Sequence, residues 1–276
     1  MTIIDFHTHA FADALAGRAL AKLAANSGLG HALDGTVGAL RASMRRAGIA
    51  RSVVCPIATR PHHYAGIRDW AREVRASAPE LEMLVSVHPD DPQAAAHLEE
   101  AAADGFKGVK FHPYYQGFSV DEPRMRPLYV KIRDLNLMVV VHCGFDIAYP
   151  HDRWCNPAKI ARLAEDFPGL KLVATHFGGW MDWEESARTL LGRPIWLDAS
   201  MASPFLPPER VREMALAHPA EYLLFGTDSP WTDQSAEVAF WKSLDLGDGF
   251  LRGFFGGNAE RLLASAGQTA GCGPIR

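Results

Sequence analysis

Eight short apolar runs, separated by longer amphipathic stretches, constrain the fold of this chain more than any other feature. The runs are rich in β-branched residues and leucine, which is typical of buried strands. In chain order they span residues 2–9, 52–57, 82–89, 106–113, 137–144, 171–178, 195–200 and 223–231. The stretches between them place apolar residues three and four positions apart and have glycine or proline near their ends, which predicts helices. The clearest of these helices are expected over residues 36–50, 66–79, 92–105, 125–136, 156–168 and 207–219.

This alternation predicts a single-domain (β/α)8 TIM barrel of the α/β class. Strands that alternate with single helices pair in parallel through right-handed crossovers, and eight such units are the number that closes a barrel. The 276 residues suit one such domain, since α/β barrels run to roughly 250 residues and no linker-like segment divides the sequence. Within the domain 1–276 we expect residues 10–51 to form a lid over the barrel mouth and residues 267–276 to form a flexible tail.

Composition and charge restrict the partners of the chain. A hydrophobic content of 48% with 22% charged residues allows a sizeable core, and the net charge of −4 comes without a basic run. We therefore expect a small-molecule substrate as partner, and neither nucleic acid nor a membrane. A homo-oligomer stays open.

The sequence also lacks the marks of export. It has no signal-peptide pattern and no apolar run near the roughly 20 residues that span a bilayer. The cysteines are scattered without a C-x-x-C pair, which argues against a disulfide scaffold and against a zinc knuckle. They are Cys55, Cys143, Cys155 and Cys272. These features predict a cytoplasmic, reduced protein.

Polar side chains of metal-binding type recur where the predicted strands end. They are His7 and His9 on the first strand, Lys110 and His112 on the fourth, His142 on the fifth, His176 on the sixth and Asp228 on the eighth. The C-terminal strand ends carry the chemistry in barrels of this kind. A single strand-end histidine is more often a surface or hydrogen-bonded core residue than a ligand. The same residue type at four strand ends is hard to obtain by packing alone, which favours a site.

Strand alternation predicts where these side chains point. Residues two apart on a strand face the same side, so Asp5 is expected on the side of His7 and His9. On the sixth strand, the same rule puts Leu172 and Ala174 on the side of His176, inside the barrel.

Imidazoles and a carboxylate at one barrel end suit a divalent metal. Zinc is the first expectation, with manganese or iron as alternatives, and one or two ions would fit. Such an ion lowers the pKa of bound water to about 7 and supplies a nucleophile without serine or cysteine. No G-x-S-x-G, P-loop or G-x-G-x-x-G pattern competes for the catalytic role.

The other histidines carry weaker signals. His88 precedes a proline and is expected to be structural or to line the pocket, while His62 and His63 are expected on its rim. Cys143 alternates with His142 and is expected to face the surrounding helices as a small apolar residue.

The motifs DFHTH, GVKFHP, VVHCG, THFGG and GTDSPW, in this order and on these strands, resemble the amidohydrolase superfamily. The resemblance is to its amidohydrolase-related (amidohydrolase 2) branch in particular and covers essentially the whole chain. The closing segment FFGGNAERLL is also similar to that branch, in which an asparagine caps a final helix after a glycine pair.

The resemblance implies roles for individual residues. His7 and His9 match the first-strand pair that holds the metal, and His142 matches the fifth-strand ligand. Asp228 matches the eighth-strand carboxylate that binds metal and takes a proton from the attacking water. His176 matches a residue that is either a ligand of a second metal or an acid/base beside a single one.

Asp5 matches a family aspartate that is not a ligand, and it is expected to support an imidazole from behind.

The fourth strand decides between one metal and two. GVKFHP resembles a motif in which the lysine, here Lys110, is carboxylated and bridges two metals, while the histidine, here His112, touches the substrate carbonyl. In the alternative, Lys110 is an ordinary lysine paired with a carboxylate such as Asp5 or with an acidic substrate. An unpaired ammonium beside a dication would be strongly unfavourable, so an inward lysine must lose or compensate its charge.

The predicted activity is that of a metal-dependent hydrolase acting on a small amide, lactone or ester-like substrate. The alternative is a metal-dependent decarboxylase of a small aromatic or unsaturated acid, because the same branch contains such lyases. A non-catalytic metal-binding barrel is the third interpretation, and it would predict a broken ligand set. The loops expected at the mouth are rich in aromatic residues, and Arg60 and Arg153 are candidates for gripping a substrate carboxylate.

Overall fold

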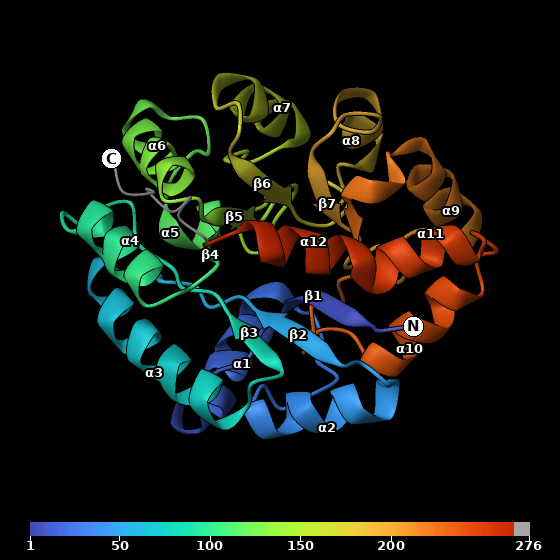
Figure 1. Ribbon diagram of the computed structural model, residues 1–276, viewed down its shortest axis with the longest axis horizontal. Helices are drawn as coiled ribbons and strands as arrows, with labels where there is room; N and C mark the ends of the chain where they lie inside the picture. Colours follow the sequence, from blue (N-terminus) through green and yellow to red (C-terminus); the bar gives the residue numbers. More distant parts are fainter. Residues whose placement is uncertain (268–276) are drawn as a thin grey trace, which may run out of the picture.

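The computed structural model describes residues 1–267 and has eight parallel strands surrounded by helices (Figure 1). The strands are β1 Ile4–Thr8, β2 Arg51–Val54, β3 Leu81–Met83, β4 Gly108–Phe111, β5 Met138–Val141, β6 Lys171–Ala174, β7 Trp196–Asp198 and β8 Leu223–Leu224. These strands are shorter than the apolar runs, because in several runs the hydrogen bonds between strands stop before the polar residues at the C-terminal end. The predicted (β/α)8 barrel is confirmed.

Two isolated β-bridges join the two sheets into a closed barrel. Strands β1 to β3 form one hydrogen-bonded sheet and strands β4 to β8 form another. Parallel bridges pair Val85 with Val109 on one side, and Thr8 with Ser229 on the other. Closure brings the ends of β1 and β8 together, so that residues at opposite ends of the sequence share one site.

The helices lie outside the strands, and those with a predicted range begin and end close to it. They are α1 Asp13–Ser27, α2 Val37–Ala47, α3 Tyr64–Ser77, α4 Ala94–Ala103, α5 Pro113–Gln116, α6 Arg126–Asp134, α7 Pro157–Asp166, α8 Trp183–Thr189, α9 Pro208–Ala217, α10 Gln234–Lys242, α11 Asp248–Arg252 and α12 Asn258–Ser265. Side-chain caps begin α2 at Thr36, α7 at Asn156 and α10 at Asp233, where each accepts a backbone N–H. No helix among residues 1–267 is long and apolar enough to cross a membrane.

Helix α12 closes the end of the barrel that lies away from the site (Figure 1). Its Leu262 and Leu263 pack with Ile4, Val140 and other residues that fill the barrel interior. Asn258 does not cap this helix, contrary to prediction, because a π-helical turn over Gly253–Gly257 joins α11 to α12 without a break. The Asn258 amide instead donates to the carbonyl oxygens of Ala220 and Leu223 at the start of β8. This residue therefore ties the closing helix to the last strand.

The predicted orientation of β1 is wrong at Asp5. Ile4 and Phe6 pack inside the barrel, and the Asp5 carboxylate accepts from the side-chain amide of Gln234 on α10, which lies outside. A register shift between Asp5 and Thr8 interrupts the alternation, so His7 still faces inward. A bulge of this kind re-aims a side chain at the end of a strand.

The predicted alternation of β6 is also wrong. Val173 packs in the barrel interior, while Leu172 and Ala174 pack against the helices. His176 nevertheless reaches the cavity because its backbone adopts a left-handed φ of 60° just after the strand. The chain turns there instead of continuing the extended pattern.

Candidate metal centre

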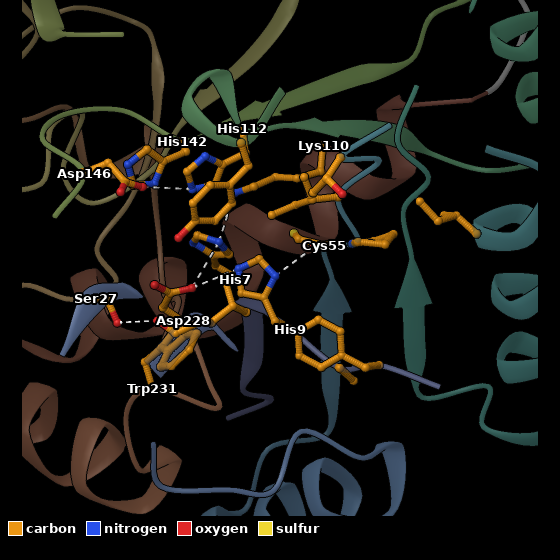
Figure 2. Close-up of a pocket in the computed structure, with 18 of the residues that line it drawn as sticks. His7, His9, Ser27, Cys55, Lys110, His112, His142, Asp146, Asp228 and Trp231 are labelled. Atoms are coloured by element: carbon orange, nitrogen blue, oxygen red, sulfur yellow. Dashed lines mark hydrogen bonds and ion pairs between the residues drawn. The ribbon is translucent and has the colours of Figure 1, made fainter. Parts of the chain in front are cut away.

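A cavity of about 490 Å³ opens at the C-terminal ends of the strands. Every strand-end residue predicted from the sequence lines it: His7, His9, Lys110, His112, His142, His176 and Asp228. Figure 2 shows His7, His9, Lys110, His112, His142 and Asp228 grouped together among the residues that line the cavity. The fold therefore brings together residues that are up to 221 positions apart in the chain, from His7 to Asp228.

Asp228 faces the two histidines of β1. Its Oδ1 atom lies 3.1 Å from Nε2 of His9 and 3.4 Å from Nε2 of His7. The same oxygen is buried and has no hydrogen-bond partner among the described residues. These three atoms form a group that is close enough to bind one cation.

Acceptor groups behind the two imidazoles indicate which ring nitrogen carries the proton. Nδ1 of His9 lies 2.8 Å from the carbonyl oxygen of Cys55, which only accepts, so Nδ1 carries the proton. Nδ1 of His7 lies 3.2 Å from Oδ2 of Asp198 and 3.1 Å from the Ser200 hydroxyl oxygen. Both Nε2 atoms are then left as lone-pair donors directed at Asp228.

His142 and His176 form a second pair of facing nitrogens. Nδ1 of His142 lies 3.2 Å from Nε2 of His176. The Ser200 hydroxyl donates to Asp198 and accepts from Nδ1 of His176 at 2.8 Å. Nε2 of His142 lies 3.3 Å from the Phe145 carbonyl oxygen and so carries the proton of that ring. The two facing nitrogens are therefore both lone-pair donors.

The protonation states suit metal binding. Burial lowers the pKa of His142 well below its usual range, and burial lowers the pKa of His176 to about 4. Burial alone would raise the pKa of Asp228, but nearby imidazoles, His7 first, outweigh it and hold the pKa below the usual range. Neutral imidazoles and an ionised carboxylate are the forms that coordinate a divalent cation. The donor atoms thus line one cavity in two groups, one made by His7, His9 and Asp228 and the other by the facing nitrogens of His142 and His176. A cation would stabilise either group.

Two of these residues have a strained backbone. His176 and Asp228 both adopt φ of 60°, a left-handed conformation that side chains with a Cβ rarely take. Such a conformation costs of order 1–3 kcal/mol per residue and is concentrated at functional sites. This left-handed backbone conformation directs both side chains into the cavity, just after β6 and β8.

Lys110 lies at the centre of the site. Its side chain is 1% exposed, and Nζ lies 3.0 Å from Nε2 of His7. Within residues 1–267 no carboxylate is within ion-pair distance of Nζ, so the predicted partner Asp5 is excluded. The Asp5 carboxylate instead accepts from the Thr227 backbone N–H and hydroxyl and from Gln234. It also accepts the backbone N–H of His7 at 3.3 Å, not an imidazole N–H, so it supports β1 through the main chain.

His112 is held in a stack of rings. Its ring packs parallel to His142 at 4.2 Å between centroids and parallel to Tyr115 at 4.0 Å. Nε2 of His112 lies 3.6 Å from Oδ2 of Asp146, and Nδ1 is buried without a hydrogen-bond partner among the described residues. Burial lowers the pKa of His112 well below its usual range, and burial raises the pKa of Asp146 to about 6. This neutral ring is available to hydrogen-bond a ligand.

Sequence reasoning missed the residues that support the histidines. Asp198 ends β7 as the other polar residues end their strands, and this position was the signal that could have found it. Burial alone would raise the pKa of Asp198, but the neighbouring His7 holds it below the usual range. Cys55 also lines the cavity, and burial raises the pKa of its thiol to about 12, so it stays protonated.

Two of the residues predicted near the cavity mouth, both arginines, differ from prediction. Neither Arg60 nor Arg153 lines the cavity, and Arg153 pairs with Asp182 at 2.6 Å. His62 and His63 do line it, as expected for the rim. His88 does not line it and accepts the backbone N–H of Asp90, in agreement with a structural role.

Only part of the predicted lid covers the cavity. Side chains from residues 10–29, which include α1, line it, whereas α2 packs against α10 on the barrel exterior. A lid movement of residues 10–51 stays a prediction.

The comparisons with known proteins agree with this architecture. A family model described as amidohydrolase matches residues 4–264. No curated protein matches the chain.

Solved structures of similar fold extend over nearly the whole chain. An uncharacterised TIM-barrel protein of Bordetella bronchiseptica is 23% identical with a TM-score of 0.77, covering 97% of this chain and 100% of its own. A 2-pyrone-4,6-dicarboxylic acid hydrolase, so assigned in Pseudomonas putida, is 21% identical with a TM-score of 0.66, covering 96% and 98%. A 5-carboxyvanillate decarboxylase of Novosphingobium aromaticivorans, complexed with manganese, is 14% identical with a TM-score of 0.69, covering 95% and 96%. At these identities the likeness establishes the fold.

Proposed function

The chain belongs to the amidohydrolase family, and from this premise we propose that it is a metal-dependent hydrolase of a small amide, lactone or ester-like substrate. The observation that carries the proposal is the convergence of His7, His9 and Asp228 on one space, with the protons of both rings held on the opposite side. Acceptor atoms this close repel one another unless a cation lies between them. Zinc suits this donor set best, and manganese is the alternative to test.

We further propose a second ion at His142 and His176, with Lys110 carboxylated between the two. The facing lone pairs of the two imidazoles support it, because nothing described between them supplies a proton. Lys110 supports it as well, since a buried ammonium without a carboxylate partner is unfavourable beside a dication. Carboxylation by carbon dioxide would turn this amine into an anionic ligand.

A divalent ion held by His7, His9 and Asp228 would supply a water of lowered pKa and a Lewis acid for the substrate carbonyl. Asp228 takes the proton from the attacking water and passes it to the leaving nitrogen or oxygen. His112, kept neutral and held by its ring stack, donates a hydrogen bond to the carbonyl oxygen as charge develops there. Asp198 and Ser200 keep the imidazoles of His7 and His176 oriented. His176 is the next candidate for the acid/base role if it does not bind metal.

A decarboxylase is the second candidate, and it depends on Lys110 keeping its charge. If its amine stays free, it would pair with the carboxylate of an acidic substrate in the same cavity. One of the solved structures of similar fold is a 5-carboxyvanillate decarboxylase complexed with manganese, which is consistent with this alternative.

The two reactions release different products. The test is a panel of aryl esters, amides, lactones and aromatic acids, incubated with protein loaded with zinc or manganese. We expect metal-dependent release of an alcohol or amine together with an acid. Release of carbon dioxide from an aromatic acid without hydrolysis of any ester, amide or lactone would replace the hydrolase by the decarboxylase.

A further inference from the structure

The cavity has two chemically different parts. Its inner end holds the metal centre, and the charged side chains that line the cavity within residues 1–267, histidines aside, are Lys110, Asp146 and Asp228 at that end. The walls away from the centre are apolar. They include Phe11, Leu15 and Leu23 on or beside α1, Ile67 and Trp70 on α3, and Trp231 after β8.

The apolar part has no fixed charge of its own. Its polar groups are neutral hydroxyls such as those of Ser27 and Thr59, together with the imidazoles of His62 and His63. No arginine lines the cavity within the described residues. A charged group placed between α1 and α3 would lose hydration without gaining a partner of opposite fixed charge, which is unfavourable.

The apolar wall continues to the mouth of the cavity. Leu15 of α1 is 51% exposed and Ile147 is 39% exposed, although both line the cavity. Large apolar side chains that stay exposed at a cavity rim are typical of a binding surface for an apolar ligand.

We propose that the substrate joins one polar reacting group to an uncharged apolar body, aryl or alkyl, that lies between α1 and α3. This inference rests on the proposed function, because the metal centre fixes which end of the substrate reacts. It excludes substrates with a second charged group at the far end. The volume of about 490 Å³ is larger than a single benzene ring requires and leaves space for a body of two fused rings.

The test uses three carboxylates that resemble hydrolysis products: benzoate, 2-naphthoate and naphthalene-2,6-dicarboxylate. Their dissociation constants are measured by calorimetry on metal-loaded protein. We expect 2-naphthoate to bind about tenfold more tightly than benzoate because the second ring is buried against apolar walls. We expect the dicarboxylate to bind at least about tenfold more weakly than 2-naphthoate because its second charge is desolvated without a partner.

A matched pair of variants locates the effect. Leu15→Lys places a cation at the cavity wall, and Leu216→Lys places one on α9, outside the cavity, at a leucine that is also 51% exposed. Leu15→Lys should weaken the binding of 2-naphthoate and strengthen the binding of the dicarboxylate, while Leu216→Lys should change neither affinity.

The proposal is overturned if the dicarboxylate binds wild-type protein as well as 2-naphthoate, or if 2-naphthoate binds no better than benzoate. It is also overturned if the two lysine variants bind 2-naphthoate and the dicarboxylate with the same affinities. Failure of the proposed function would look different, since the binding preference would persist while no ester, amide or lactone is hydrolysed.

Discussion

Nδ1 of His142 and Nε2 of His176 face each other at 3.2 Å, and the partners of both rings hold their protons on the opposite nitrogens. Two lone pairs at this separation repel unless a cation or a proton lies between them. Burial lowers the pKa of both rings, which disfavours the proton. The relationship therefore favours a cation as the group that completes the site.

Replacing the carboxylate of Asp228 should separate catalysis from folding. Asp228→Asn keeps the size of the side chain but removes its capacity to accept a proton from water. We expect turnover to fall roughly a thousandfold, with the circular dichroism spectrum unchanged and at least part of the metal retained. Near-wild-type turnover on any identified substrate would remove Asp228 from the role of base, and His176 would be tested next.

Asp198 should act on the metal through His7. Asp198→Asn weakens the acceptor that orients the His7 ring, so we expect the metal dissociation constant to rise about tenfold to a hundredfold. Asp91→Asn is the matched control, because Asp91 also lies beside a histidine Nδ1, that of His97 at 2.8 Å, but outside the cavity. Equal metal affinity in the two variants would show that Asp198 does not position a ligand.

Lys110→Ala should reveal whether the lysine is a bridging ligand. We expect the metal content to fall from about two ions per chain to about one, and short carboxylic acids to restore part of the lost ion and activity. Elemental analysis with and without added acetate or propionate measures both effects. An unchanged content of one ion would exclude the carboxylated bridge and strengthen the decarboxylase alternative.

Glu237 on α10 should make stability depend on pH. Burial raises its pKa to about 7 from an ordinary value of 4.5, although the Ser203 hydroxyl donates to it. The folded protein therefore holds this proton more tightly than the unfolded chain does. The stabilising contribution of protonated Glu237 to the free energy of unfolding is fully present below pH 4.5 and is lost as the pH rises through 7.

The variant Glu237→Gln mimics the protonated form at every pH. We expect it to match wild-type stability near pH 5 and to exceed it by roughly 1–3 kcal/mol near pH 8, as measured by urea unfolding. Glu209→Gln, at an exposed glutamate on α9, serves as the control and should show no such trend. A Glu237→Gln variant that is less stable than wild type at both pH values would contradict the assignment.

The barrel could be predicted from the sequence because each strand and helix carries its own pattern. Alternation of the two types leaves few topologies, and the strand ends of any such barrel meet at one mouth. The seven polar strand-end residues lie together for this reason, although His7 and Lys110 are 103 positions apart.

The local orientation of these residues could not be predicted in the same way. The shift in β1 between Asp5 and Thr8 and the left-handed turn at His176 both break strict alternation. Their energies depend on closure against β8 and on contacts with β7, which no local pattern records. The position of Asp198 at the end of β7 marked it as a strand-end polar residue, but its partner could not be predicted, since the ring of His7 lies beside it only in the closed barrel.

The central claim is that the converging imidazoles and Asp228 hold divalent metal, and elemental analysis of freshly purified protein tests it most directly. We predict about two ions per chain, mainly zinc, or recovery of that content when metal-depleted protein is reloaded with zinc or manganese. A content well below one ion per chain, with no gain on reloading, would contradict the account.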